Sequence, residues 1–179
     1  MIRNVTTFLR RFRREEDGQM MVEFAVLVPL VFTLFLTSVE MGMYAMRQSF
    51  LDRGLDMAVR NVRLNTGVNY SHKDIKEMVC EYSGFLPDCD DALKLEMSPV
   101  NVRAFVSLPE IPDCIDVSLP VTPSRTFVHG SDHQLMLLRA CYKFDPIFPT
   151  TGLGYSFSKD GSGQAQMVSM SGFVQEPGI

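Results

Sequence analysis

The chain has 179 residues, a formal net charge of −4 and four cysteines. This length allows one membrane helix and one small domain, and a mildly acidic domain gives no reason to expect nucleic-acid binding, which requires a clustered basic face. Positive charge is concentrated in the first 14 residues, whereas the part from Glu40 onward has 17 acidic and 12 basic residues. We therefore expect no nucleic acid among the partners.

Residues 1–18 form a short basic leader. Its arginines include Arg10, Arg11, Arg13 and Arg14. Positive charge beside a membrane segment keeps that end of the chain in the cytoplasm. These four arginines are therefore interpreted as topology determinants, and the C-terminal bulk is expected on the opposite side of the membrane.

Residues 19–39 are predicted to be a transmembrane helix. Between Met20 and Val39 the only charged residue is Glu23. About 20 such residues can cross a bilayer, and an ionisable residue inside the segment is costly enough to be a functional candidate. The run exceeds the apolar core of ordinary signal peptides and lacks a convincing small-x-small site after it, so the segment is expected to remain as an anchor.

Residues 40–67 are predicted to continue the same helix in amphipathic form. This stretch contains no proline before Gly67. One helical face carries an apolar stripe, formed by Tyr44, Leu51, Leu55, Ala58 and Val62. The pattern predicts a single helix of about 45 residues whose second half packs on a domain, or alternatively on a partner helix.

Residues 68–179 are predicted to form an α+β domain. A short helix is expected over His72–Tyr82 with Ser71 as its N-cap, and Thr150–Gln164, with four glycines, reads as a flexible loop. Alternating apolar patterns predict strands over Leu93–Met97, Val100–Val106, Cys114–Leu119, Gln134–Phe144 and Ala165–Val174. A long helix followed by an antiparallel sheet is an α+β arrangement.

The four cysteines all follow the predicted membrane segment. An even number in an oxidising compartment predicts two disulfides, for which three connectivities are possible. Proximity favours Cys80–Cys89, which leaves Cys114–Cys141. Zinc and free thiols are the alternatives, but the spacings match no common zinc module.

No other motif predicts chemistry. His129 and His133 flank a glycine-containing turn that could hold a metal, but a polar turn is the simpler interpretation. Neither a phosphate-binding loop nor a recognisable catalytic set is present in the sequence. We expect no cofactor, no metal and no enzymatic activity.

The N-terminal third resembles the TadE-like family of pseudopilins, small membrane proteins of the tight-adherence (Flp-type) pilus system. The resemblance rests on Gly18-x4-Glu23-Phe24, the apolar helix that follows, and its amphipathic continuation to Val62. A weaker similarity covers Cys141–Pro149 and the end of the chain. The resemblance to the family implies a pilin-like protein of the bacterial inner membrane whose C-terminal domain is periplasmic.

The resemblance also implies processing. A prepilin peptidase would cut between Gly18 and Gln19, leaving Glu23 as the fifth residue of the mature chain. Its carboxylate would lie about one helical turn from the new α-ammonium group, in its own chain or a neighbour's, and could set the register between subunits. The alternative is that Glu23 reaches the headgroups and has no role.

The function that the resemblance implies is that of a minor pseudopilin in the assembly or initiation of a Tad pilus. Its partners would be inner-membrane lipid, the prepilin peptidase, other pilins or pseudopilins, and the pilus assembly platform. The competing hypothesis is an unprocessed, signal-anchored periplasmic binding or adhesion module in which Glu23 is incidental.

Overall fold

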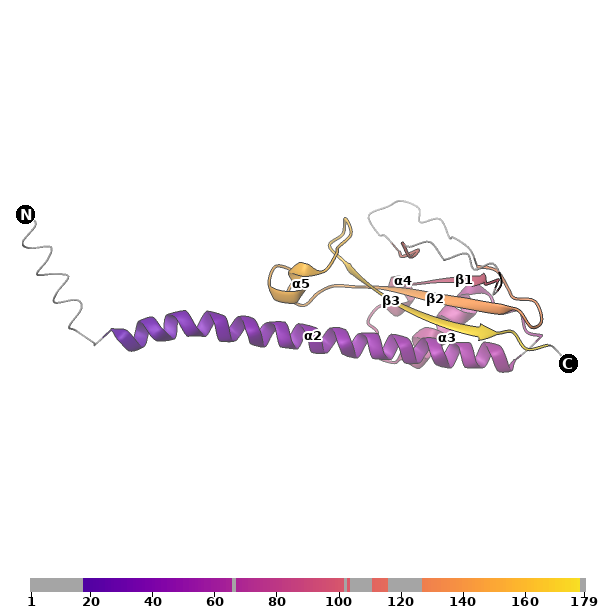
Figure 1. Ribbon diagram of the computed structural model, residues 1–179, viewed down its shortest axis with the longest axis horizontal. Coiled ribbons are helices and arrows are strands. Elements are labelled where there is room, and N and C mark those ends of the chain that lie inside the picture. Colours follow the sequence, from indigo (N-terminus) through magenta and orange to yellow (C-terminus); the bar gives the residue numbers. More distant parts are fainter. Residues whose placement is uncertain (1–17, 66, 102, 104–110, 116–126, 178–179) are drawn as a thin grey trace, which may run out of the picture.

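A computed structural model describes residues 18–65, 67–101, 103, 111–115 and 127–177 (Figure 1). A long N-terminal helix carries a small three-stranded sheet along its second half. The predicted α+β fold is confirmed. The four leader arginines that were expected to set the topology lie outside the described residues.

Helix α2 (Gln19–Leu64) runs without a break from the predicted membrane segment into the amphipathic segment. At 1.5 Å per residue, its 46 residues span about 69 Å. The helix is long and apolar enough to cross a membrane, and its most apolar stretch is not buried by the domain. It is therefore a candidate membrane anchor.

Helix α3 (His72–Ser83) packs beside the second half of α2. Its start is fixed by reciprocal capping: the Ser71 hydroxyl accepts the Asp74 N–H, and the Asp74 carboxylate accepts the Ser71 N–H at 2.8 Å. This exchange satisfies two of the donors that a helix start leaves free. Gly84 ends the helix in the left-handed region at φ 65°. The predicted helix and its N-cap are confirmed.

Three antiparallel strands form the sheet in the order β1-β2-β3. They are β1 (Leu93–Pro99), β2 (Leu135–Phe144) and β3 (Ala165–Val174). A single turn of helix, α4 (Cys89–Ala92), leads into β1. Successive side chains of a strand point to opposite faces of the sheet, so the residues of β2 lie alternately on the face toward the helices and on the other face.

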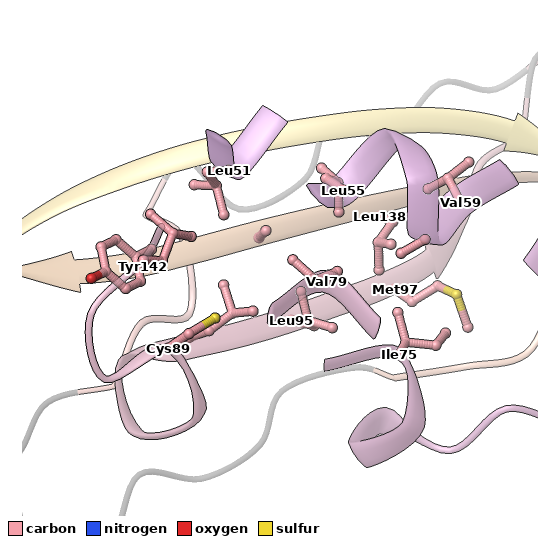
Figure 2. Packing of buried hydrophobic residues seen from close by; sticks show 14 of the residues in the cluster. Leu51, Leu55, Val59, Ile75, Val79, Cys89, Leu95, Met97, Leu138 and Tyr142 are labelled. Atoms are coloured by element: carbon pink, nitrogen blue, oxygen red, sulfur yellow. The ribbon is translucent and has the colours of Figure 1, made fainter. Parts of the chain in front are cut away.

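One face of the sheet packs against α2 and α3 and forms the core (Figure 2). Helix α2 contributes Leu51, Leu55 and Ala58, all fully buried, from the stripe that the sequence predicted. Helix α3 contributes Ile75 and Val79. The facing side of the sheet supplies Leu93, Leu95, Met97, Met136, Leu138, Ala140 and Tyr142. Burying a side chain of this size stabilises the fold by about 1.5–3 kcal/mol.

The other face of the sheet is charged and yet also buried. Glu96 of β1 and Arg139 of β2 are register partners and form a buried ion pair. Farther along, Lys94 Nζ lies 3.0 Å from a carboxylate oxygen of Asp113. Pairing offsets the cost of removing these charges from water, so this face can be buried although it is charged.

The structure corrects two expectations about secondary structure. Asn101, Arg103, Cys114 and Ile115 are not in strands, and the remaining residues of the strands predicted at 100–106 and 114–119 lie largely outside the described residues. The expected flexible loop at 150–164 contains a short helix, α5 (Gly152–Ser156). It is also held at Asp160, whose carboxylate accepts hydrogen bonds from Lys143 Nζ at 2.9 Å and the Gln164 N–H at 3.0 Å.

Candidate functional site on α2

Gly18 is the residue immediately before α2. Its carbonyl oxygen accepts the first helical hydrogen bond, from the Val22 N–H at 3.2 Å. Gly18 is exposed, and among the described residues nothing lies within 4 Å of where a Cβ would stand. The peptide bond after Gly18 therefore lies at the exposed start of the helix; processing at this bond stays a prediction.

Glu23 is exposed in the second turn of α2. The first turn contains no acidic residue, and Gly18 supplies no side-chain cap. Helix starts attract negative charge because their free N–H groups carry partial positive charge. Glu23 stands at i+4 from Gln19, about one turn away, so the spacing suits the predicted pairing with an ammonium group at Gln19; the pairing stays a prediction.

A second carboxylate on α2, Glu40, joins the helix to the domain. Its side chain is buried, with 3% of the residue exposed. One carboxylate oxygen accepts the Ile147 N–H at 3.0 Å and the other accepts the Phe148 N–H at 2.9 Å. Because hydrogen bonds to a charged acceptor are stronger than neutral ones, this arrangement ties the segment after β2 to α2. We call it the Glu40 clamp.

Sequence reasoning missed the Glu40 clamp. From the sequence, Glu40 is only the first residue after the predicted membrane segment. The signal was present, since Glu40 precedes Tyr44 by four residues and Leu51 by eleven, which puts it on the apolar stripe that the domain covers. A charged residue on a buried stripe needs a partner in the domain.

Glycines allow the clamped segment to approach the helix closely. Gly152 begins α5 at φ 55°, and an added Cβ would lie 2.5 Å from Thr37 Oγ1. At Gly154, a Cβ would clash with the Phe148 carbonyl oxygen. A larger residue at Gly152 would force α5 away from α2, and a larger residue at Gly154 would force α5 away from the clamped segment at Phe148.

Arg47 holds the same segment from the domain side. Its guanidinium lies 5.4 Å from the centre of the Phe144 ring, and Nη1 donates to the Asp145 carbonyl oxygen at 3.4 Å. Glu40 and Arg47 therefore contact consecutive parts of the chain between β2 and α5. The junction of the candidate anchor and the domain is thus a set of specific polar contacts.

The cysteines form two disulfides in the structure. Cys80 of α3 joins Cys89 of α4, with Cα atoms 5.7 Å apart, and Cys114 joins Cys141 of β2, with Cα atoms 5.3 Å apart. This is the connectivity that proximity favoured in the sequence. The second disulfide ties the segment near Asp113 onto the charged face of the sheet.

The two histidines at the glycine-containing turn lie in different local environments. His129 Nε2 lies 2.7 Å from the Tyr70 carbonyl oxygen, and His133 adopts a left-handed backbone conformation at φ 62°. Within the described part of the chain, no group of three or more His, Cys, Asp or Glu residues could hold a metal ion.

Comparison with known protein families gives a match for the N-terminal third of the chain. Residues 18–60 match the family model of TadE-like proteins. The match begins at Gly18 and extends through Glu23 and Glu40 into the part of α2 that covers the sheet, and it confirms the resemblance drawn from the sequence. No curated protein and no solved structure matches the chain.

Proposed function

We propose that this chain, TadE-like over residues 18–60, is a minor pseudopilin that serves in the assembly or initiation of a Tad (Flp-type) pilus. A prepilin peptidase cuts after Gly18, α2 anchors the product in the inner membrane, and the disulfide-linked domain is periplasmic. The observation that carries the proposal is the coincidence of the TadE-like match with an exposed Gly18 at the mouth of α2. The role is structural and involves no catalysis.

Cleavage changes the chemistry of the helix start in a defined way. Removing Gly18 takes away the carbonyl that accepts the Val22 N–H and creates an α-ammonium group on Gln19. That group has a pKa near 8 in model peptides, so it is mostly cationic at neutral pH. Within a membrane, Glu23 is the carboxylate that can neutralise it, in the same chain or in a neighbouring pilin.

The mature N-terminus tests the proposal directly. The full chain is isolated from its own membranes, and its intact mass and N-terminal peptide are measured. A chain beginning at Gln19 supports processing by a prepilin peptidase. A chain beginning at Met1 contradicts the proposal and favours the unprocessed, signal-anchored module.

Substitutions at Gly18 and Glu23 distinguish an effect on cleavage from an effect on pilus assembly. Bulky substitution of Gly18 should leave the N-terminus uncut, whereas Glu23→Gln should be cut normally and yet reduce surface pili. Gly42→Ala is the matched control, because Gly42 lies on the same helix with nothing within 4 Å of an added Cβ. Normal piliation in Glu23→Gln cells would remove the assembly role of this carboxylate.

A further inference from the structure

The segment between β2 and β3 contains a long uncharged stretch. From Pro146 to Ser158 it has no acidic or basic residue, and Asp145 and Lys159 bracket it. Its apolar side chains include Ile147, Phe148, Leu153, Tyr155 and Phe157. We call residues 146–158 the α5 loop.

The α5 loop lies on α2 at the end of the predicted membrane segment. In Figure 1, α5 lies over the middle of α2, displaced from the rest of the domain toward the N-terminus. Leu36 and Thr37 of α2 and Leu153 of the loop line a cavity of about 50 Å³ between them. The Glu40 clamp fixes this position through the Ile147 and Phe148 N–H groups.

Helix geometry gives the depth of this contact. About 20 helical residues cross the hydrocarbon core of roughly 30 Å, so a core that begins at Met20 ends near Val39. Thr37 then lies about 3 Å inside its outer edge, and Thr33 lies about 9 Å inside it. A segment that contacts Thr37 is therefore at the level where hydrocarbon meets headgroups.

The exposed side chains of the α5 loop suit that level. Tyr155 is 73% exposed and Ile147 is 42% exposed. Lys159 Nζ lies 5.9 Å from the centre of the Tyr155 ring and donates to the Pro149 carbonyl oxygen at 2.7 Å. Tyrosine, which has an apolar ring and a polar hydroxyl, is enriched at membrane–water interfaces, and a lysine can lay its stem along apolar surface while its charged end stays in water.

We propose that the α5 loop lies in the outer interfacial layer of the membrane, with Tyr155 and Ile147 in contact with lipid. The proposal rests on the proposed membrane anchoring of α2. Lipid is the occupant that the geometry favours, because the loop lies at the end of the α2 stretch whose apolar side chains between Met20 and Phe35 are exposed, and its own Tyr155 and Ile147 are exposed as well. The domain would then be held against the bilayer at a second point besides its anchor.

The chain contains no tryptophan, so single tryptophan reporters can test this contact. The full chain is reconstituted at low protein density into phosphatidylethanolamine/phosphatidylglycerol vesicles with and without brominated acyl chains. Tyr155→Trp reports on the α5 loop and Phe32→Trp on the anchor. Val174→Trp is the matched control, since it is an exposed site near Glu176, which pairs with Arg63 in the last turn of α2, about 36 Å beyond Val39 along the helix.

The expected result is that brominated lipid removes about half or more of the Tyr155→Trp emission and leaves the Val174→Trp emission unchanged. Quenching of Phe32→Trp without quenching of Tyr155→Trp would overturn the lipid contact while leaving the anchor intact. Failure of Phe32→Trp to be quenched would overturn both the anchor and the contact. A blue-shifted, unquenched Tyr155→Trp emission that reverts on dilution in the bilayer would mean that a second copy covers the loop, and would also overturn the proposal.

Discussion

Gly54 of α2 and Ser83 of α3 occupy facing positions that leave no room for a methyl group between the helices. A Cβ built on Gly54 would overlap the Ser83 hydroxyl and lie 2.6 Å from the Val79 carbonyl oxygen. The Ser83 hydroxyl itself donates to that carbonyl at 2.6 Å. The spacing of α2 and α3 over the sheet is therefore fixed at this crossing.

Gly54→Ala should destabilise the domain even though alanine favours helices. Relieving the overlap must separate α2 from α3, and overpacking of this kind costs about 1–3 kcal/mol. Gly42→Ala on the same helix should be neutral or stabilising by up to about 1 kcal/mol, because its Cβ meets nothing. Thermal unfolding of both variants in detergent, followed by circular dichroism, compares them. Equal melting temperatures would contradict the close crossing.

Glu40→Ala should loosen the α5 loop from α2. It leaves the Ile147 and Phe148 N–H groups without their acceptor, at an expected cost of about 2–4 kcal/mol. Glu40→Gln keeps one carbonyl acceptor and should cost less. Limited proteolysis of the full chain in detergent should show new cleavage near Phe148 in Glu40→Ala. Glu77→Ala, which removes an exposed partner of Lys73, is the control expected to stay resistant.

The two disulfides should contribute unequally to stability. Cys114–Cys141 closes a longer loop, with a sequence separation of 27 against 9 for Cys80–Cys89. Loop-closure entropy predicts about 3.6 and about 2.7 kcal/mol respectively. Paired serine substitutions followed by denaturant unfolding measure the difference. Native protein should bind no thiol reagent before reduction, and any alkylation of unreduced protein would contradict the pairing.

Asp160 should make stability depend on pH in the acid range. Burial disfavours its charge, but hydrogen bonds from Lys143, Ser162 and Gln164 outweigh this and lower its pKa to about 2, from about 3.8. A carboxyl whose pKa is lowered on folding stabilises the fold above its unfolded pKa, and this contribution is lost as the pH falls through the folded value.

Asp160→Asn should therefore lower the melting temperature near neutral pH, where the lost hydrogen bonds to a charged acceptor cost about 1–3 kcal/mol. The gap to the unaltered chain should close between about pH 4 and pH 2. Asp90→Asn, at an exposed site in α4, is the control and should follow the unaltered chain throughout. A gap that stays constant down to pH 2 would show that Asp160 does not act through its charge.

Local patterns predicted the long helix, α3 and all three strands of the sheet, because each element rests on a pattern of residues close in sequence. The stripe from Leu51 to Val62 and the Ser71–Asp74 capping pair are examples. The Glu40 clamp and α5 could not be predicted in this way. They depend on contacts between residues more than 100 positions apart, which bring backbone donors of a glycine-rich loop to the helix. Alternation alone also predicted strands at Asn101 and Cys114, which lie outside strands; Cys114 is instead held by its disulfide to Cys141.

The proline in α2 makes the resistance of the long helix to bending differ along its length. Pro29 cannot donate a backbone hydrogen bond, so the helix is weakest to bending around that residue. The Glu40 clamp lies about three turns, or about 16 Å, farther along. Bending around Pro29 would therefore fall before the part of α2 that the domain contacts, which begins near Thr37. The sheet, the α5 loop and the helix from Thr37 onward would then move together when a force acts on the N-terminal end.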